Sequence, residues 1–489
     1  MYSSIVNGQV SKPEHIFDRA REWEGLVRFA TADSADVRLG TVSGRRRQGK
    51  TYLLDAAANT FGGFFFTATD STEVESLASF GRALASYGGR YAFADWDEAL
   101  ERLFRAVGEG LIIIDEFPYL MKASPSLPSL IQRALGPRGY AQQSSARLLL
   151  SGSAMSVMGQ LLGGSAPLRG RASLELIIRP FGYRDAARFW DIGDPRLAVL
   201  VHSIVGGTPA YRREFVGGDS PTSLADFDAW VLRTVLNPQL PLFREARHLL
   251  AEETEIRDTA IYHAVLGAIA SGNATRGGIA SYIGRKSTDI GHPLAVLEDS
   301  QLISRETDPF RKGRSLYRIT EPLIIFYEAV MRREWTRLER GDTAGAWHNS
   351  QATFLSQVVG PHFEAVCRDW ALSSGAEVFG MVPGEVAAGV VADPLRRGQI
   401  QVDVAVFAPD EPGRPRRVLS LGEAKWDKVM NPGHLERLRR ARDLLSVKGY
   451  DTTGARLTCY SGARFDSELA DRAAGDPLIQ LVGLEELYA

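Results

Sequence analysis

The residues near the amino terminus that could do chemistry form one short glycine-containing loop. Its sequence is Ser43-Gly44-Arg45-Arg46-Arg47-Gln48-Gly49-Lys50-Thr51-Tyr52, and Gly44 to Thr51 fit the pattern GxxxxGK[ST] at every fixed position. Backbone amides in such a loop close around a phosphate, and the following helix adds partial positive charge. Lys50 would reach the β- and γ-phosphates of ATP, the Thr51 hydroxyl would ligate Mg²⁺, and Tyr52 completes the predicted nucleotide-binding stretch. A glycine-rich turn in a basic loop is the alternative.

Two acidic residues that end an apolar run form the second candidate group. The run is Leu111-Ile112-Ile113-Ile114-Asp115-Glu116-Phe117. Acids at the carboxyl end of a buried parallel strand lie where open α/β sheets bind ligands. We expect Asp115 to hold Mg²⁺ through water and Glu116 to polarise the attacking water as a general base. An exposed acidic turn is the alternative, and the phosphate loop upstream disfavours it.

Three further side chains are candidates for the γ-phosphate. Ser153 follows the apolar run from Arg147, where it could sense the γ-phosphate or the attacking water; a simple strand-ending turn is an equal alternative. Arg169 and Arg171 lie in Pro167-Leu168-Arg169-Gly170-Arg171. An arginine there would stabilise transition-state charge in its own site or in a neighbour's. A solvated surface arginine is the default.

The carboxyl-terminal part of the chain carries a second set of charged residues. They are Glu364 on a predicted helix at 354–372, Asp403 on a predicted strand at 399–407, and Glu423 with Lys425 on a predicted strand at 417–426. Glu423 and Lys425 are two apart and share one face. Asp403 and Glu423 would hold Mg²⁺ or Mn²⁺, with Glu364 and the Ala424 carbonyl as further ligands. Lys425 would orient or deprotonate water. An incidental Glu–Lys pair on a partly polar sheet is the alternative.

The elements around the phosphate loop alternate between strands and helices, which is typical of an α/β fold with a parallel sheet. Predicted strands lie at 37–42, 63–67, 111–116, 147–153 and 174–178, and a charged helix at 16–26 precedes them. In the tail, strands are predicted at 377–382, 399–407, 417–426 and 455–460, with a basic helix at 435–447. On the 399–407 strand, alternation places Ile400 and Val402 with Val404 and Val406 on one face, and Asp403 on the other.

Residues 255–320 have the order of a winged helix. Helices are predicted at 256–270, 275–283 and from Ser287 to about 302, followed by strands at 303–306 and 315–319. From Arg276 to Arg318 basic residues exceed acidic ones by three. Basic side chains at the third helix and wing would meet DNA phosphates; they are Arg285, Lys286, Arg311, Lys312 and Arg314. A winged helix that only transmits the state of the ATPase is equally open.

Taken together, these motifs resemble the archaeal-type ATPases of the STAND group of P-loop NTPases over roughly residues 15–330. That resemblance implies a five-stranded parallel core, a helical lid and a winged helix, and it implies nucleotide contact by Gly207-Thr208-Pro209 through Pro209. The tail resembles the PD-(D/E)XK nuclease fold, an α/β restriction-endonuclease-like domain. It departs from that pattern in a Pro/Gly-rich loop at 383–398, and in Gln401 where an acidic residue is common.

The expected domains follow from these assignments. They are the ATPase core at 1–185, a helical lid at 186–250, the winged helix-turn-helix at 251–337, a linker at 339–350, and the nuclease-like domain at 350–489. The net charge of −2 gives no global sign of nucleic acid, and two cysteines exclude a disulfide framework. With no apolar run of membrane-spanning length, we expect a cytoplasmic protein without membrane contact.

Two functions remain open from the sequence. The first is an ATPase coupled to a DNA-binding or metal-dependent DNA-cleaving tail, with ATP, Mg²⁺ and DNA as partners. The second is a nucleotide-switched regulatory protein whose tail binds but does not cleave. Either is compatible with a homo-oligomer.

Overall fold

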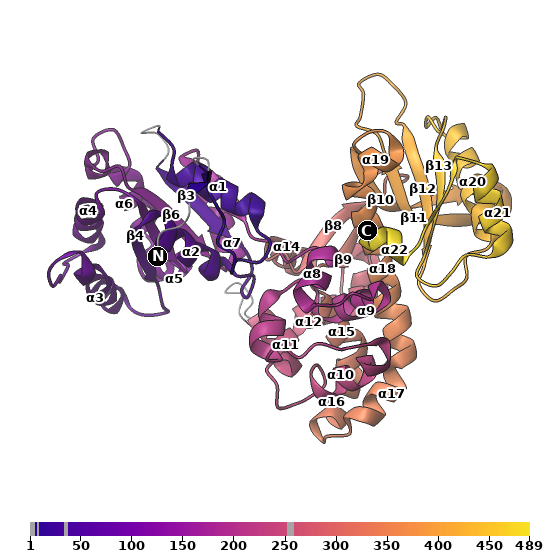
Figure 1. Ribbon diagram of the computed structural model, residues 1–489, viewed down its shortest axis with the longest axis horizontal. Coiled ribbons are helices and arrows are strands. Elements are labelled where there is room, and N and C mark those ends of the chain that lie inside the picture. The colour runs from indigo at the N-terminus through magenta and orange to yellow at the C-terminus, as the bar shows by residue number, and fades with distance from the viewer. Residues whose placement is uncertain (1–4, 7–8, 34–37, 252–258) are drawn as a thin grey trace. The chain divides into compact units, whose positions relative to one another are not determined.

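The computed structural model describes residues 5–6, 9–33, 38–251 and 259–489 (Figure 1). The chain divides into two compact units. The first comprises Met1–Pro180, Thr208–Ala210 and Asp299–Gln301, and the second comprises Phe181–Gly207, Tyr211–Glu298 and Leu302–Ala489. The predicted boundary at 185 lies close to this division, whereas the other predicted boundaries fall inside the second unit. Val37 and residues 256–258, where two predicted elements begin, lie outside the described residues.

A five-stranded sheet forms the centre of the first unit. Its strands are β3 (Leu39–Ser43), β4 (Gly63–Thr67), β5 (Leu111–Asp115), β6 (Arg147–Gly152) and β7 (Ala172–Ile177). Their order is β4-β5-β6-β3-β7 and every pair is parallel, so the predicted parallel α/β core is confirmed. Strand β6 lies between β3 and β5, which brings the ends of all three strands to one edge.

Helices cover both faces of this sheet (Figure 1). On one face α1 (Ala20–Ala30) and α2 (Lys50–Phe61) pack against Ile113 and Leu149. On the other, α3 (Glu73–Leu84) and α4 (Trp96–Val107) pack against Ile112 and Ile114. The short helices α5 (Phe117–Ala123), α6 (Leu127–Ala134) and α7 (Met155–Leu162) complete the unit. Burial of both faces explains why β5 and β6 are continuous apolar runs rather than alternating ones.

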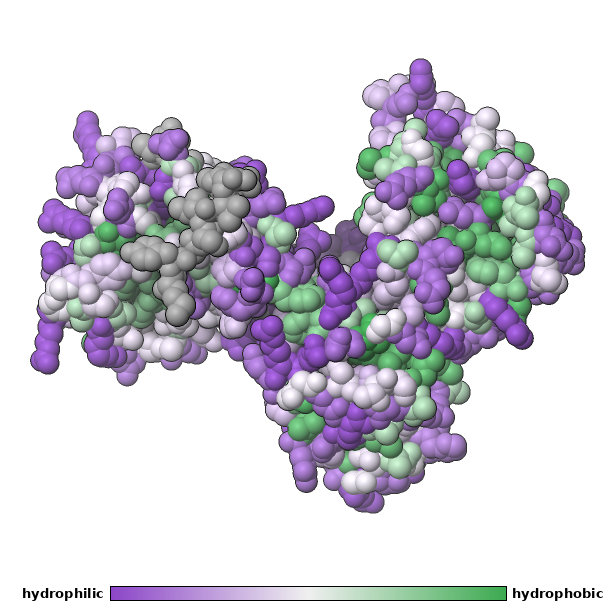
Figure 2. Space-filling model, viewed as in Figure 1, coloured by the Kyte–Doolittle hydropathy of each residue, from purple (hydrophilic) through white to green (hydrophobic). Residues whose placement is uncertain are grey.

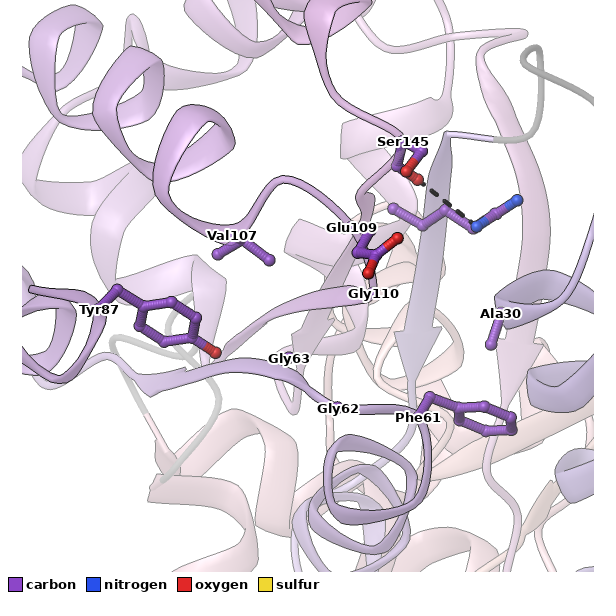
Figure 3. A pocket seen from close by; sticks show the side chains of 10 residues that line it. Ala30, Phe61, Gly62, Gly63, Tyr87, Val107, Glu109, Gly110 and Ser145 are labelled. Atoms are coloured by element: carbon purple, nitrogen blue, oxygen red, sulfur yellow. Dashed lines mark hydrogen bonds between the residues drawn. The ribbon is translucent and has the colours of Figure 1, made fainter.

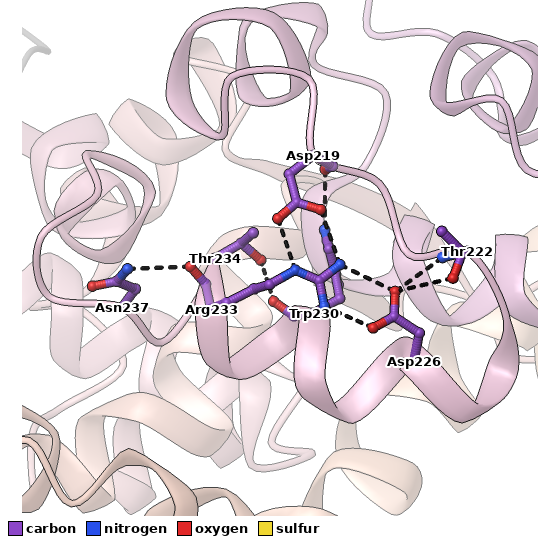
Figure 4. Close-up of polar contacts among 7 residues, drawn as sticks. All are labelled: Asp219, Thr222, Asp226, Trp230, Arg233, Thr234 and Asn237. Carbon is purple, nitrogen blue, oxygen red and sulfur yellow. Dashed lines mark hydrogen bonds and ion pairs between the residues drawn. The ribbon is translucent and has the colours of Figure 1, made fainter.

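The second unit begins with a helical segment. Its helices are α8 (Tyr183–Trp190), α9 (Pro195–Val205), α10 (Phe227–Arg233) and α11 (Leu242–Ala251). Arg233 on α10 holds the loop before it, because its guanidinium donates to both carboxylate oxygens of Asp219 and of Asp226 (Figure 4). These hydrogen bonds lower the pKa of Asp226 to about 2.

Three helices and a hairpin follow. They are α12 (Thr259–Ala270), α13 (Arg276–Tyr282), α14 (Gly291–Asp299), β8 (Ile303–Thr307) and β9 (Ser315–Ile319), and the two strands are antiparallel. The third helix begins at Gly291 rather than at Ser287, so the predicted cap is wrong. The Ser287 carbonyl instead accepts from Nε of Arg276.

The predicted linker at 339–350 is a helix. After α15 (Pro322–Phe326), a π-helical turn and α16 (Arg332–Glu339), helix α17 spans Thr343–Thr353. Asp342 caps α17 by accepting from the Gly345 amide, and Trp347 is buried with its Nε1 donating to Asp228. Packing of Trp347 against Phe227 of α10 therefore outweighs the local polar composition.

The tail, residues 360–489, is a mixed five-stranded sheet between helices. Its strands are β10 (Glu385–Asp393), β11 (Gly398–Phe407), β12 (Val418–Lys425), β13 (Arg456–Ser461) and β14 (Ile479–Val482), in that spatial order. Strand β11 is antiparallel to both of its neighbours, β10 and β12, and the last three strands are parallel. Helix α18 (Gly360–Ser373) packs on one face, and α20 (Pro432–Val447) with α21 (Ser467–Gly475) covers the other. Helix α22 (Leu484–Tyr488) ends the chain.

The first tail strand was predicted in the wrong place. Residues 375–379 form helix α19 (Gly375–Phe379), and the predicted loop at 383–398 contains β10. Small residues there accommodate the loop between β8 and β9. A Cβ on Gly389 would lie 2.6 Å from Phe310 and 2.9 Å from the Asp308 carboxylate. Close packing, rather than a turn, therefore explains the glycine.

A β-bulge breaks the predicted alternation of β11. Ala387 pairs with Ala405 but Gly389 pairs with Val402, so β11 has one more residue than β10 at Asp403 and Val404. Ala405 consequently joins Val402 in the core under α20, whereas the alternation predicted opposite faces. Bulges next to functional sites re-aim side chains, and this one occurs at the predicted metal ligand Asp403.

Two histidines form a hydrogen-bonded pair inside the second unit. Nδ1 of His202 on α9 lies 2.9 Å from Nε2 of His362 on α18. Burial lowers the pKa of His202 to about 4, and burial together with the neighbouring ring lowers the pKa of His362 well below its ordinary value. The folded state therefore favours the neutral form of both rings.

We expect acid to destabilise the protein through this pair. His202 takes up a proton below about pH 6.5 in the unfolded chain but only near pH 4 in the folded chain. The free energy of unfolding therefore falls as the pH drops from about 6.5 to about 4, and His202 alone accounts for roughly 2–3 kcal/mol at about pH 4. Urea midpoints measured at about pH 7 and about pH 5 should differ less in a His202→Gln/His362→Gln double variant than in the wild type. The exposed His348→Gln control should keep the wild-type difference. An unchanged difference in the double variant would contradict this role.

The surface visible in Figure 2 is mostly hydrophilic, in agreement with cores buried inside each unit. Within the described residues, every helix is too short or too polar to cross a bilayer.

Candidate functional site

The phosphate loop connects β3 directly to α2, as the motif requires. Gly49 precedes the helix with φ +84°, and a Cβ on Gly44 would lie 2.5 Å from the Ile178 carbonyl oxygen. Arg47 also adopts a left-handed conformation, with φ +67°. Left-handed positions of this kind turn successive amides toward one side of a loop and form a concavity for anions. The strand–loop–helix arrangement predicted from the sequence is therefore present.

Lys50 is buried in this loop, at 5% exposure. Its Nζ donates to the carbonyl oxygens of Gly44 at 2.6 Å and Arg45 at 2.9 Å. Burial lowers the pKa of Lys50 to about 8, although the carboxylates of Glu116 and Asp115 oppose that shift. An ammonium that contacts neutral carbonyls while buried is incompletely compensated, and a phosphate group would supply the missing negative charge.

We expect ATP affinity to depend on this lysine's charge. Bound phosphates raise the pKa of Lys50 above about 8, so ATP binding above that pH must be accompanied by uptake of a proton. The affinity for ATP should therefore fall up to tenfold for each pH unit above about 8 and should stay level below about pH 8. The dissociation constant of Mg–ATP measured between about pH 7 and about pH 9.5 tests this expectation. A constant value throughout that range would contradict it.

Thr51 and Asp115 come together at the start of α2 and the end of β5. The Thr51 hydroxyl donates to Oδ2 of Asp115 at 2.7 Å, and Asp115 is fully buried. A hydroxyl and a carboxylate at this spacing are hard oxygen donors suited to Mg²⁺ beside a nucleotide. Both predicted ligands therefore fit a Mg²⁺ ion.

Glu116 lies beside the end of β6. Its Oε2 accepts a 2.8 Å hydrogen bond from the Ser153 hydroxyl, which in turn accepts from Nε of Arg46 at 3.4 Å. Arg46 also donates to the Tyr119 hydroxyl at 2.6 Å. Glu116 itself has φ +52°, a strained conformation that turns it out of the strand direction. The predicted base and the predicted sensor are thus in direct contact, and Arg46 joins them to the phosphate loop.

The Gly-Thr-Pro motif also touches the phosphate loop. Nε2 of Gln48 donates to the Thr208 hydroxyl at 3.1 Å, and Pro209 lies 4.0 Å from where a Gly49 Cβ would stand. Residues Thr208–Ala210 belong to the first unit although they are distant from it in sequence. Arg19 supports the loop from the other side by donating to the Gln48 carbonyl at 3.2 Å.

Two predicted arginines lie outside this network. Arg169 and Arg171 are exposed, and Nη1 of Arg169 donates to the Gly164 carbonyl. In the described part of the chain, no hydrogen bond or ion pair joins either guanidinium to the phosphate loop. Tyr52 is half exposed, and its ring faces His15 edge-on at 5.7 Å.

A hollow of about 430 Å³ lies at the opposite edge of the same sheet (Figure 3). Gly62, Gly63 and Gly110, which precede or begin β4 and β5, line it together with Tyr87 and Glu109. These are the amino ends of the strands, whereas the phosphate loop follows the carboxyl end of β3. The hollow contains none of the predicted site residues.

Asp403 is the centre of the tail site. It is 2% exposed, and its carboxylate accepts from the Ala424 amide at 3.0 Å, Nζ of Lys425 at 3.3 Å and Nε2 of Gln401 at 2.9 Å. Gln401, which stands where an acidic residue was expected, therefore orients the carboxylate. Arg368 of α18 donates to the Asp403 carbonyl from behind.

Glu423 faces the same lysine. Its Oε1 lies 3.2 Å from Nζ of Lys425 and accepts from Nη1 of Arg437 at 3.0 Å. Its Oε2 is buried and has no hydrogen-bond partner among the described residues. Nζ of Lys425 also donates to the Ala424 carbonyl, the further ligand predicted from the sequence. The lysine thus gathers the donors expected to hold a divalent cation, and the unsatisfied oxygen fits a metal ligand.

Glu364 is the least well placed of the predicted metal ligands in the tail. Burial and the negative charge of Asp403 raise the pKa of Glu364 to about 7. Among the described residues, no three His, Cys, Asp or Glu side chains are grouped closely enough to hold a metal. The arrangement brings Asp403, Glu423 and Lys425 together and leaves Glu364 beside them.

The predicted DNA-contacting residues divide into two groups. Arg285 and Lys286 are exposed between α13 and α14. The loop that carries Arg311, Lys312 and Arg314 instead packs on the tail. Phe310 lies against Phe407 and Tyr450, the Tyr450 hydroxyl donates to the Pro309 carbonyl, and Arg311 donates to Gln399.

Sequence reasoning placed Arg46 and Gln48 in the predicted nucleotide-binding stretch and Thr208 in the Gly-Thr-Pro motif, but it did not predict their contacts. Arg46 donates to Ser153, and Gln48 donates to Thr208. Tyr119, which accepts from Arg46, and Arg19, which lies on the predicted helix at 16–26, had no assigned role. Arg437 lies on the predicted basic helix at 435–447, and its pairing with Glu423 carries no local signal.

Comparison with known proteins gives limited further information. No protein-family model matches the chain. Over 354 residues it is 26% identical to MJECL04, an uncharacterized protein of Methanocaldococcus jannaschii, and the match covers 71% of this chain and 76% of that protein.

Several solved structures resemble the chain weakly. The Walker-type ATPase PABY2304 of Pyrococcus abyssi has a TM-score of 0.47 at 19% identity, over 64% of this chain and 96% of that one. The ORC2 protein of Aeropyrum pernix, in ADPNP–ADP complexes, has a TM-score of 0.40 at 14% identity, over 68% and 96%. The STAND protein PH0952 of Pyrococcus horikoshii has a TM-score of 0.29 at 14% identity, over 76% and 52%. Similarities this weak carry no functional argument, so the proposals below depend on this chain's own residues.

Proposed function

We propose that the first unit binds and hydrolyses Mg–ATP. The observation that carries this proposal is the convergence of Lys50, the Thr51–Asp115 pair and the Glu116–Ser153 pair at the carboxyl edge of one parallel sheet. Each is a different part of the machinery for phosphoryl transfer: a phosphate-binding cation, a metal-binding oxygen pair and a base.

In this mechanism Lys50 exchanges the carbonyls of Gly44 and Arg45 for the β- and γ-phosphates, and loop amides bind the same oxygens. Thr51 and Asp115 would hold Mg²⁺, which neutralises charge on the phosphates when bound. Glu116 accepts a hydrogen bond from the attacking water and holds it in line. Ser153 donates to Glu116 and Arg46 donates to Ser153, so both side chains would shift when Glu116 reorients toward the γ-phosphate. Thr208 contacts Gln48, so loop closure around nucleotide reaches the segment that follows α9.

Replacing Glu116 by glutamine separates binding from hydrolysis. Glu116→Gln keeps the side-chain shape and its acceptor for Ser153 but removes the base, so Mg–ATP should bind within about threefold of the wild type while hydrolysis falls at least about 100-fold. Phosphate release and filter binding measure the two properties. A variant that hydrolyses ATP at the wild-type rate would remove Glu116 from the mechanism.

For the tail, the favoured activity is metal-dependent cleavage of a phosphodiester. Asp403, Glu423 and the buried unpartnered Oε2 of Glu423 favour it, because they are oxygen donors arranged around Lys425. A divalent cation there would activate water and polarise the phosphate. Lys425 would release its two carboxylates to the metal and turn to the attacking water or the phosphate. The order α18-β10-β11-β12-α20-β13 agrees with the nuclease-like fold expected for such a site.

DNA is the substrate class we assign to this activity. Helices α12–α14 with the β8–β9 hairpin form the proposed winged helix, and Arg285 and Lys286 are exposed between α13 and α14. If the tail binds DNA without cutting it, the protein is instead a nucleotide-controlled binding module. Cleavage assays distinguish these alternatives.

A further inference from the structure

A pocket of about 580 Å³ lies between α20 and the turn that joins β10 to β11. The turn contributes Arg396, and β11 contributes its first residues from Gly398 to Ile400. Along α20 the lining residues extend from Gly433 to Asp443, about three turns of the helix. The pocket is therefore built from two fixed elements of the tail.

Arginine dominates the lining. The five arginines are Arg396, Arg437, Arg439, Arg440 and Arg442, against the three carboxylates Asp393, Glu436 and Asp443. Positive charge therefore exceeds negative charge by two. Arginine guanidinium groups recognise phosphate through paired N–H donors, and they keep their charge at any physiological pH.

The carboxylates of the pocket hold the arginines in place. Arg440 donates through Nε and Nη2 to both oxygens of Asp393, which is buried. Arg439 donates to Glu436, which is also held by Arg472 from α21. These pairs fix the guanidinium positions before any ligand arrives, so little conformational entropy remains to be lost on binding.

Arg437 joins this pocket to the predicted metal site. It lines the pocket, and its Nη1 donates to Oε1 of Glu423 at 3.0 Å. A ligand phosphate in the pocket would therefore lie one side chain away from the Asp403–Glu423 pair.

The lining also indicates how the ligand is recognised. Small-molecule pockets are lined mainly by apolar and aromatic side chains, whereas this pocket has no aromatic residue and Ile400 is its one bulky apolar side chain. No platform for stacking a base is present among these lining residues. Recognition through the phosphates alone is typical of contacts to the nucleic-acid backbone.

We propose that this pocket binds the phosphodiester backbone of a nucleic acid strand and presents a neighbouring phosphodiester to Asp403 and Glu423. This inference rests on the proposed function of the tail. It assigns binding of the nucleic-acid backbone to α20 and to the β10–β11 turn. The β8–β9 loop of the proposed winged helix does not take this role, because it packs on the tail.

The test is DNA binding by the full-length protein in EDTA, where no cleavage can occur. Fluorescence anisotropy of labelled single- and double-stranded oligonucleotides would be compared for the wild type and an Arg396→Gln/Arg442→Gln double variant. These two arginines are chosen because, in the described part of the chain, neither guanidinium pairs with Asp393 or Glu436; the Arg396 backbone amide donates to Asp393, and the substitution keeps that amide. Arg414→Gln is the matched control, since Arg414 is 74% exposed in the same tail and pairs only with Glu411 among the described residues.

The double variant should bind at least about tenfold more weakly, and the slope of log affinity against log salt should fall by about two. Arg396→Lys/Arg442→Lys should keep most of the slope, which separates lost charge from lost folding. Equal affinity and slope in the double variant and the Arg414→Gln control would overturn the proposal. Displacement of DNA by inorganic phosphate at matched phosphate concentration would also overturn it, because the pocket would then serve a small phosphorylated molecule.

Repeating the assay with Mn²⁺ in place of EDTA separates the proposed backbone-binding pocket from the proposed nuclease activity. If DNA binding depends on Arg396 and Arg442 but no cleavage occurs in Mn²⁺, the nuclease activity is rejected and the backbone-binding pocket is retained. If the protein cleaves DNA but its DNA affinity is the same with and without the two arginines, the backbone-binding pocket is rejected and the nuclease activity is retained.

Discussion

Lys50→Ala should abolish detectable binding of Mg–ATP, weakening it by at least about 100-fold. Lys50 is the cation that the buried loop holds against the carbonyl oxygens of Gly44 and Arg45. A charge-assisted bond to phosphate in a site of low polarity contributes roughly 1.5–3 kcal/mol, and the loss of the charge also leaves Asp115 and Glu116 unopposed against the nucleotide. Isothermal titration with ATP and Mg²⁺ measures the effect.

The loss should be one of binding and not of folding. Burial lowers the pKa of Lys50, which means that the folded protein tolerates the charge at a cost, so the alanine variant should melt no lower than the wild type without nucleotide. Lys122→Ala is the matched control: Lys122 lies in the same unit, is 63% exposed and pairs with Asp70 at the surface. It should bind ATP normally. Normal ATP binding by Lys50→Ala would show that the loop is not the nucleotide site.

Asp403→Asn should abolish metal-dependent cleavage of DNA, with a fall of at least about 100-fold. The substitution keeps the size of the side chain and its acceptor for the Ala424 amide. It removes the charge that, with Glu423, would hold the cation and that now pairs with Lys425. Purified protein would be incubated with DNA in Mg²⁺ or Mn²⁺, with and without ATP.

Asp410→Asn is the control for that measurement. Asp410 is 79% exposed in the same tail and lies 3.4 Å from Arg416, so its loss should leave cleavage unchanged. Cleavage by the wild type that persists in Asp403→Asn would come from another site or a contaminant. Absence of cleavage in the wild type under all these conditions, with ATP binding intact, would favour the binding-module alternative.

The first unit was predictable from sequence because its signals are local and dense. Strand, phosphate loop and helix are contiguous from Leu39 to Phe61, and the run that ends in Asp115 is apolar on both faces. Strand order was not predictable in this way. The insertion of β6 between β3 and β5 brings Ser153 to Glu116, and no residue-level pattern encodes that pairing.

In the tail, tertiary packing overrode local signals. The small residues of β10 indicated a loop, but Gly389 is small because Phe310 and Asp308 from the β8–β9 loop press against it. Strict alternation along β11 was wrong because of the bulge at Asp403, whose extra residue is invisible without the partner strand. The same occurred before the tail, where Trp347 was assigned to a linker because its neighbours are polar, yet it is buried against Phe227.

The predicted site residues nonetheless lay on suitable elements. Lys50, Thr51, Asp115, Glu116 and Ser153 are in mutual reach, and so are Asp403, Glu423 and Lys425. Arg169 and Arg171 were less predictable, because an arginine that acts on a γ-phosphate is defined by its position relative to nucleotide rather than by its neighbours in sequence. Glu364 is near the tail carboxylates, but it is not grouped with them as a ligand.

The structure of the full-length protein with Mg²⁺ and a non-hydrolysable ATP analogue tests the proposed ATPase most directly. The β- and γ-phosphates should lie in the loop from Gly44 to Thr51, with Nζ of Lys50 moved from the Gly44 and Arg45 carbonyls to the phosphate oxygens. Mg²⁺ should contact the Thr51 hydroxyl, with Asp115 behind a water, and Glu116 should face the γ-phosphate. Nucleotide bound elsewhere, such as in the hollow at the amino ends of the strands, with Lys50 still on its carbonyls, would contradict the proposed function.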